Sequence, residues 1–156
     1  RHTGPTLSPF NAWILLKGLE TLEYRINQHC INAKTVAEFL AQHQSVEKTI
    51  YPGLNTHPQY ELAKKQMTQP GSIVTFCIKG DRAFNFINNL KLFDISNNFG
   101  DTKSLVTHPT TTTHRVLGEE GREKLSITNN MVRLSIGLED VEDLIEDIDQ
   151  ALSKAN

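Results

Sequence analysis

The segment from residue 130 to residue 140 constrains the fold more than any other part of the chain. Its first half alternates in the way that a strand with one buried face requires. One face carries Val132, Leu134 and Ile136, and the other carries Met131, Arg133 and Ser135. Gly137 ends the strand, and the acidic residues after it favour the positively polarised N-terminus of a helix. Asp140 is the predicted N-cap, and the apolar face of the helix contains Val141, Leu144, Ile145, Ile148 and Leu152.

This pattern places the guanidinium of Arg133 on the polar face of a short strand. A planar cation held in this way is suited to binding a carboxylate through two parallel hydrogen bonds. The same position also fits a strand arginine that pairs with an acidic side chain at the surface, because such pairs are common. Spacing alone favours the surface pair.

A long apolar stripe occupies the N-terminal part of the chain. Ser8 and Pro9 have the chemistry of a helix start, as a cap and a first helical residue. The apolar positions then recur every three or four residues, at Leu15, Leu19, Leu22, Ile26, Cys30, Ala33, Ala37 and Leu40. An unbroken helix from Pro9 to His43 would be about 50 Å long, so we expect a bend, at Gly18. A helix of this length indicates that it also contacts a neighbouring domain or subunit.

The remaining elements predict an α/β fold, with one sheet and helices packed on it. Strands are expected at residues 46–51, 72–78, 92–96, 105–108 and 131–136, and helices at residues 60–67 and 81–90. Asp81 is the expected cap of the second of these helices, whose buried face would contain Ala83, Phe84, Ile87 and Leu90. The length of 156 residues predicts a single domain, residues 1–156.

Composition excludes several classes of protein. The net charge is −2, with 16 basic and 18 acidic residues interspersed, so no basic surface for nucleic acid is predicted. The longest apolar run, residues 12–16, is too short to span a membrane. Cys30 and Cys77 have no disulfide framework around them, which predicts reduced, buried thiols in a cytoplasmic protein. The first residue is Arg1 and not methionine, so we expect that a segment upstream has been removed.

Other candidate sites are weaker. Ser45 and Lys48 have a Ser-x-x-Lys spacing, but no partner motif accompanies them. His108 and His114 flank a threonine run without the spacing of metal ligands, so no metal site is predicted. The segments 97–101 and 110–113 fit either ligand-binding loops or ordinary turns, and the residues alone leave both interpretations open.

Taken in order, the motifs of the chain resemble a known family. They are LSPFNAW, KGLETL, HC-x-NA-x-x-VA-x-FL, YPGL, GSIVTF, LFDISNNFGD, SLVTHPTTTTH and VRLSIGLEDVEDLIEDI. Together they resemble the C-terminal domain of the Cys/Met-metabolism family of pyridoxal-phosphate (PLP) enzymes of fold type I. This resemblance implies a small domain with a long N-terminal helix and one mostly antiparallel sheet. Within the family, the chain is most similar to the homoserine-ester sulfhydrylases, and Asn98 is part of that similarity.

The resemblance also implies roles for single residues. Arg133 matches the arginine that binds the substrate α-carboxylate. Asn98 matches a position that contacts the same carboxylate or the cofactor region, and Thr113 matches a threonine near the cofactor and substrate. Ser104 and Leu105 belong to the same motif and are given supporting roles in the pocket.

The family's Schiff-base lysine and the groups that hold PLP have no match in this chain, so no catalytic residue is predicted here. The resemblance therefore implies the substrate-binding domain of a homotetrameric enzyme, inactive alone, that makes homocysteine from an O-acylhomoserine and sulfide. The alternatives are the same domain of a cystathionine γ-synthase or methionine γ-lyase, or a stand-alone α/β binding module without catalysis.

Overall fold

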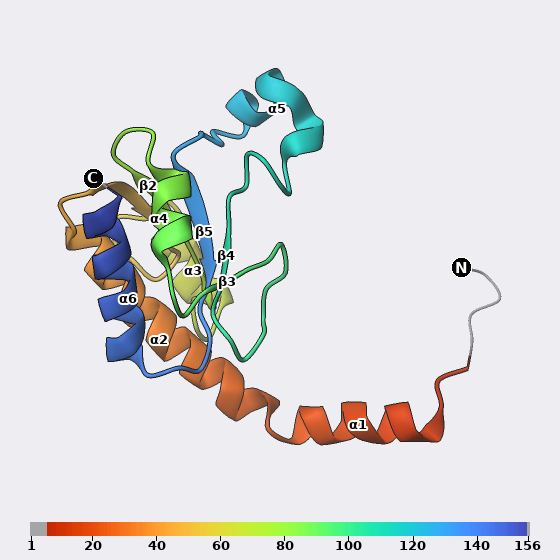
Figure 1. Ribbon diagram of the computed structural model, residues 1–156. Coiled ribbons are helices and arrows are strands. Elements are labelled where there is room, and N and C mark those ends of the chain that lie inside the picture. The colour runs from red at the N-terminus through yellow and green to blue at the C-terminus, as the bar shows by residue number, and fades with distance from the viewer. Residues whose placement is uncertain (1–5, 156) are drawn as a thin grey trace.

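Figure 1 shows a computed structural model of the chain, in which residues 6–155 are described. The helices are α1 (Pro9–Glu20), α2 (Leu22–Gln42), α3 (Tyr60–Gln66), α4 (Ala83–Asn89), the 3₁₀ helix η1 (Arg115–Leu117), α5 (Gly118–Lys124) and α6 (Val141–Lys154). The strands are β1 (Val46–Ile50), β2 (Ile73–Ile78), β3 (Asp94–Ile95), β4 (Leu105–Thr107) and β5 (Met131–Ser135). The α/β architecture predicted from the sequence is confirmed.

The five strands form one sheet in the order β1-β2-β5-β4-β3. The pairings β1–β2, β2–β5 and β4–β5 are antiparallel, and β3–β4 is parallel. The sheet is therefore mostly antiparallel, as the family resemblance implied. β5 lies in the middle, where Arg133 is opposite Thr75 of β2 and Thr107 of β4.

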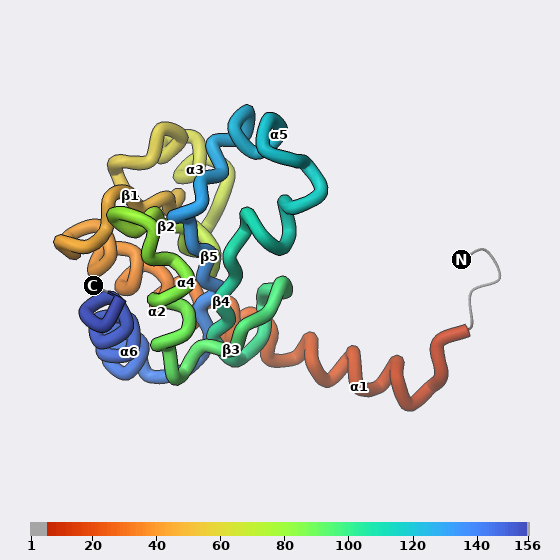
Figure 2. The backbone as a smooth tube through the Cα atoms, turned by 45° about the horizontal axis from the view of Figure 1, so that its top comes forward, coloured from red at the N-terminus to blue at the C-terminus, as the bar shows by residue number. Residues whose placement is uncertain are grey.

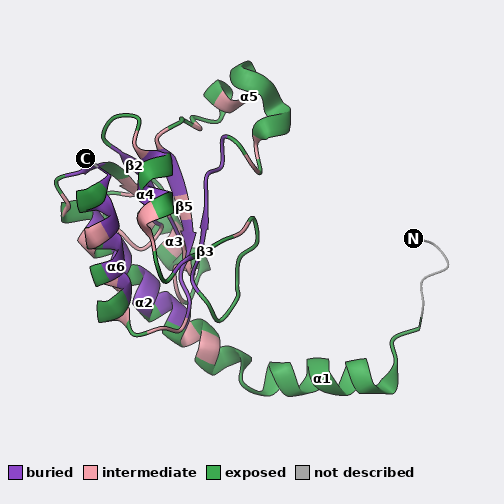
Figure 3. Cartoon of the chain, viewed as in Figure 1, coloured by how far each residue is buried: buried purple, intermediate pink, exposed green. Residues whose placement is uncertain are grey.

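The core lies between one face of this sheet and the helices α2, α4 and α6 (Figure 3). Phe76 of β2 and Phe86 of α4 are fully buried and meet edge to face, with ring centroids 5.5 Å apart. Val132 and Leu134 of β5 are also fully buried, as the alternation predicted. Burial of each such side chain contributes about 1.5–3 kcal/mol, which fixes which face of β5 points inward. The opposite face of the sheet carries Arg133.

Two of the three predicted helix caps, Ser8 and Asp140, are present. The Ser8 side chain accepts a hydrogen bond from the backbone N–H of Asn11 (3.2 Å), and Asp140 accepts one from Glu142 (2.9 Å). Each bond satisfies a donor that the first turn of a helix leaves without an intrahelical partner.

The predicted bend at Gly18 is wrong, because the long helix is interrupted at Thr21. Gly18 lies within α1 and has open space around it. The Arg25 side chain donates to the Gly18 carbonyl oxygen (2.6 Å) and to the Thr21 hydroxyl (3.3 Å). It thereby satisfies a carbonyl group at the end of α1. This side chain lies several residues further along the chain and spans the break between α1 and α2.

The expected details of α4 also need correction. Arg82, not Asp81, occupies the N-cap position, and the helix begins at Ala83. Its buried face contains Ala83, Phe86 and Ile87, whereas Phe84 is 52% exposed. The Phe84 ring instead lies against the ring of His108, with centroids 4.6 Å apart.

The helices η1 and α5 are not predicted from the sequence, because their residues are mostly polar and form no apolar stripe.

Cys30 and Cys77 are both buried, as predicted. Burial raises the pKa of both thiols, because the charged thiolate loses hydration.

Among residues 6–155, no helix combines the length and apolar character needed to cross a bilayer.

Helix α1 has no buried residue and projects away from the rest of the chain (Figure 2). Its large apolar side chains are all more than 45% exposed and are Phe10, Trp13, Ile14, Leu15, Leu16 and Leu19. A group of exposed apolar side chains of this kind on one helix is typical of an interface.

We expect the isolated chain to self-associate through α1. Apolar area that water covers in the monomer would be buried by association, at about 25 cal/mol per Å². Sedimentation velocity over a range of concentrations would measure the effect, and Leu15→Glu combined with Leu19→Glu should reduce it. A wild-type chain that stays monomeric at high concentration would contradict this prediction.

Candidate functional site

The side chain of Arg133 is half-buried on the open face of the sheet and is held by main-chain oxygens. Its Nη2 donates to the carbonyl oxygen of Asn97 at 2.8 Å and lies 3.4 Å from that of Asn98. The hydroxyl of Thr107, its neighbour on β4, is also 3.4 Å from Nη2. The direction of the guanidinium is therefore set by the loop after β3 and by β4.

None of the described residues places a carboxylate within 4.0 Å of Arg133. Burial lowers the pKa of Arg133, because the charged form loses hydration. Carbonyl oxygens orient a guanidinium but leave its net charge uncompensated. The surface ion pair that spacing alone favoured is thus not formed with any residue from 6 to 155. Nη1 and Nε make no hydrogen bond within this part of the chain, so donors for an external anion remain.

Asn98 is the one predicted partner that lies within hydrogen-bonding distance of Arg133. It is exposed, its carbonyl faces Nη2, and its backbone N–H donates to the Ser96 hydroxyl at 3.2 Å. Thr113 is different: it is exposed, its hydroxyl pairs with the His114 ring at 2.8 Å, and it has no contact with Arg133 among the hydrogen bonds of the described chain.

Ser104 and Leu105 are buried. Leu105 is opposite Ser135 in the β4–β5 pairing, so both side chains project from the face that carries Arg133. The Ser104 hydroxyl instead accepts a hydrogen bond from the backbone N–H of Gly137 at 2.8 Å. Its role in this chain is to connect the start of β4 with the turn after β5.

Glu139 is a contributor to this region that the sequence did not single out. Its Oε1 accepts from the backbone N–H of Ser104 (2.7 Å), and its Oε2 accepts from the Ser104 hydroxyl (2.9 Å). In the sequence, Glu139 was one of several acids at a helix start. A separation of 35 residues between the two partners hides their contact from any local pattern.

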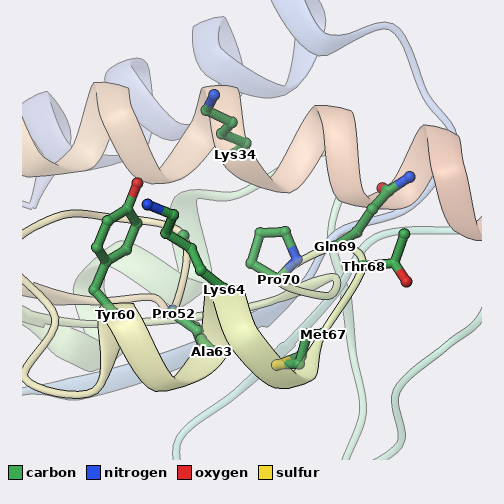
Figure 4. A pocket seen from close by; sticks show the side chains of 10 residues that line it. Lys34, Pro52, Tyr60, Ala63, Lys64, Met67, Thr68, Gln69 and Pro70 are labelled. Atoms are coloured by element: carbon green, nitrogen blue, oxygen red, sulfur yellow. The ribbon is translucent and has the colours of Figure 1, made fainter.

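A separate cleft of about 260 Å³ lies between α2 and the α3 region (Figure 4). Lys34, Tyr60, Lys64, Met67 and Pro70 are among the residues that line it. The two lysines already have acidic neighbours, Glu38 at 3.9 Å and Glu61 at 3.6 Å. Neither Arg133 nor the residues around it contribute to this cleft, so it is not part of the candidate site.

No group of three or more potential metal ligands is found within residues 6–155. His108 is buried and uses both ring nitrogens internally, with the Thr111 hydroxyl (2.9 Å) and the Asn129 carbonyl (2.7 Å). This histidine holds the threonine segment against the start of β5.

Comparison with known proteins identifies the family. Residues 1–153 match the family described as Cys/Met metabolism PLP-dependent enzyme. The chain belongs to this family. Members of this family use PLP as their cofactor.

Two relatives show which activities occur among similar family members. The O-succinylhomoserine sulfhydrylase of Mycobacterium tuberculosis is 54% identical over 159 residues, covering 98% of this chain. The L-methionine gamma-lyase of Fusobacterium nucleatum is 47% identical over 154 residues, covering 97% of this chain. The chain spans only 39% of the length of each of these relatives.

A solved structure shows the same fold. It is a crystal structure from Campylobacter jejuni described as an O-acetylhomoserine (thiol)-lyase, with N′-pyridoxyl-lysine-5′-monophosphate. It superposes with a TM-score of 0.91 at 42% identity, covering 97% of this chain and 37% of that one. The architecture is therefore that of a fold-type I family member.

The described residues do not themselves fit PLP. The cofactor is held by an imine to a lysine amine, and such lysines are made reactive by a desolvated pocket or a nearby charge. Every lysine of this chain is exposed. Lys103, in the loop next to Asn98, lies 3.5 Å from Asp94 in an exposed ion pair. This part of the protein thus offers a half-buried cation without an acidic partner among residues 6–155, Arg133, but no lysine suited to the cofactor.

We expect the isolated chain to form no specific adduct with PLP. Exposed lysines react slowly and without preference, because nothing around them stabilises an imine. Borohydride reduction followed by intact-mass and peptide analysis should show only scattered, substoichiometric labelling that grows with the PLP concentration. Complete labelling of one lysine at equimolar PLP would contradict the prediction.

Proposed function

We propose that this chain is the C-terminal, substrate-binding domain of a PLP-dependent sulfhydrylase that makes homocysteine from an O-acylhomoserine and sulfide. The proposal includes that residues 1–156 form one domain, that the full enzyme is a homotetramer, and that this chain alone is inactive. The 54% identity to a protein named O-succinylhomoserine sulfhydrylase supports the choice of reaction.

The observation that carries the proposal is the uncompensated charge of Arg133. A partly buried cation is costly unless an anion or hydrogen bonds stabilise it. Here carbonyl oxygens fix the orientation of the guanidinium, and no carboxylate of residues 6–155 neutralises it. An amino-acid substrate has an α-carboxylate, whose negative charge and planar shape are complementary to the guanidinium. Arg133 would bind this carboxylate and thereby orient the α-carbon.

The other site residues have smaller proposed roles. Asn98 would support the bound carboxylate from the loop that already contacts Arg133. Thr113, on an exposed segment, would approach the substrate from the side of the cofactor. Leu105 would line the pocket, since it shares a sheet face with Arg133, and Ser104 would support the turn beneath it.

The full-length enzyme provides the test. With O-succinylhomoserine or O-acetylhomoserine and sulfide, it should release homocysteine and the corresponding acid, and the rate should depend on the sulfide concentration. The 1–156 chain, assayed in parallel with added PLP, should release none. Formation of homocysteine by the chain alone would contradict the proposal.

The 47% identity to an L-methionine gamma-lyase favours one competing reaction. A lyase would eliminate the γ-substituent without sulfide, as the carboxylic acid from an O-acylhomoserine, and hydrolysis of the remainder would release ammonia and a 2-oxo acid. Detection of the 2-oxo acid at a rate independent of sulfide would assign the chain to that reaction.

A further inference from the structure

The loop from Ser96 to Ser104 orients Arg133, but packing does not hold this loop in place. Residues 97–103 are all exposed. A loop without buried side chains keeps one conformation only if hydrogen bonds offset the loss of chain entropy. The bonds that hold it come from β5, from the turn that follows β5 and from Thr107 of β4.

The first of these bonds comes from the same strand as Arg133. The Ser135 hydroxyl accepts a hydrogen bond from the backbone N–H of Gly100 at 3.1 Å. Ser135 is two residues from Arg133, so both side chains project from the same face of β5. One strand therefore carries the cation and also holds the loop that orients it.

The second group of bonds comes from the turn after β5. Glu139 accepts two hydrogen bonds from Ser104, at the end of the loop. The backbone N–H of Leu138 donates to the Thr102 carbonyl at 2.8 Å. Glu139 has no basic partner in the described chain, so its carboxylate is used for the backbone and hydroxyl of Ser104. At the other end of the loop, the Thr107 hydroxyl donates to the Ser96 carbonyl.

We propose that Ser135 and Glu139 are positioning residues for Arg133. They hold the loop from Ser96 to Ser104 where the Asn97 and Asn98 carbonyl oxygens direct the guanidinium towards the substrate carboxylate. Neither residue touches the substrate. The inference rests on the proposed function of Arg133. It adds the groups that fix the orientation of the Arg133 guanidinium.

The test compares two ligands of the full-length holoenzyme that differ only in the carboxylate. L-Norleucine has no leaving group on its side chain, and L-norleucinamide replaces its α-carboxylate with a neutral amide. Calorimetric titration gives the ratio of the two dissociation constants, which isolates the contribution of the carboxylate. Arg133→Ala should bring this ratio close to one.

Ser135→Ala and Glu139→Gln should each lower the ratio about three- to tenfold, as expected for the loss of one hydrogen bond in a positioning network. In the Arg133→Ala background, Ser135→Ala should change the ratio no further. Ser45→Ala is the matched control, because Ser45 is also a buried serine but lies just before β1, away from the loop. It should keep the wild-type ratio.

Three results would each contradict one of the two proposals. If Arg133→Ala lowers the ratio but Ser135→Ala does not, the positioning role is wrong and the proposed function stands. Equal weakening of both ligands by Ser135→Ala would also contradict it, because that is the effect of a general loss of structure. If Arg133→Ala itself retains the wild-type ratio, the proposed function of Arg133 fails. Ser135→Ala removes a single hydroxyl, so the test does not depend on the Glu139 variant folding.

Discussion

In the full-length enzyme, Arg133→Ala should lower kcat/KM for the amino-acid substrate by roughly ten- to a hundredfold. The substitution removes a charge-assisted pair that contributes about 1.5–3 kcal/mol, and each 1.36 kcal/mol corresponds to about a factor of ten. A further loss follows if the α-carbon is no longer oriented for reaction. Steady-state kinetics with the O-acylhomoserine as the varied substrate would measure the effect.

Two comparisons separate this role from a structural one. Arg133→Lys should recover little activity, because an ammonium cannot form the two parallel hydrogen bonds of a guanidinium. The thermal midpoint should change little in either variant, since Arg133 contacts an exposed loop and not the core. A lowered midpoint with normal kcat/KM would instead mark Arg133 as a structural residue.

Gly137→Ala should destabilise the chain by about 3 kcal/mol, at the upper end of the usual cost of overpacking. A Cβ at this position would lie 2.5 Å from the Thr102 carbonyl oxygen and 2.6 Å from the Lys103 carbonyl carbon, and would overlap with the Glu139 carboxylate. Two of these neighbours are backbone atoms, and the carboxylate is held by Ser104, so none can move at low cost. For a chain of this size, the thermal midpoint should fall by roughly 6–12 °C.

Gly18→Ala is the matched control for this substitution. Gly18 is in the exposed helix α1, and a Cβ there would meet nothing within 4 Å. Alanine at this position should be neutral or stabilising by about 0.5–1 kcal/mol, because it reduces the entropy of the unfolded chain. If Gly137→Ala unfolds at the same denaturant concentration as Gly18→Ala, the crowded turn after β5 contributes nothing to stability.

The parts of the fold that depend on neighbouring residues could be predicted from the sequence. The caps at Ser8 and Asp140 are formed by side chains that bond within two or three residues. The inward face of β5 follows from a period of two, which burial of Val132 and Leu134 enforces. These features require no knowledge of the tertiary structure.

The prediction from the sequence differs from the structure at the helix boundaries and wherever residues far apart in the sequence make the contact. The helix breaks at Thr21, whose hydroxyl accepts from Arg25, and in α4 Phe86 rather than Phe84 lies in the core. Arg133 was identified as a candidate cation, but its partners are main-chain carbonyls. Every residue has a carbonyl group, so no residue type marks such a contact in a sequence. The contact of Glu139 with Ser104 was missed because the partners meet only when β4 and β5 pair.

The position of β5 between β2 and β4 has a consequence for how the chain is made. β5 is synthesised after the other four strands, yet it is the one that joins β1–β2 to β4–β3. Until it emerges from the ribosome, β2 and β4 each present an unpaired edge, which is a template for aggregation. Closure of the sheet must then wait for strands far apart in sequence, and such non-local pairing is slow. Arg133, at the centre of this last strand, is therefore positioned only when the sheet is complete.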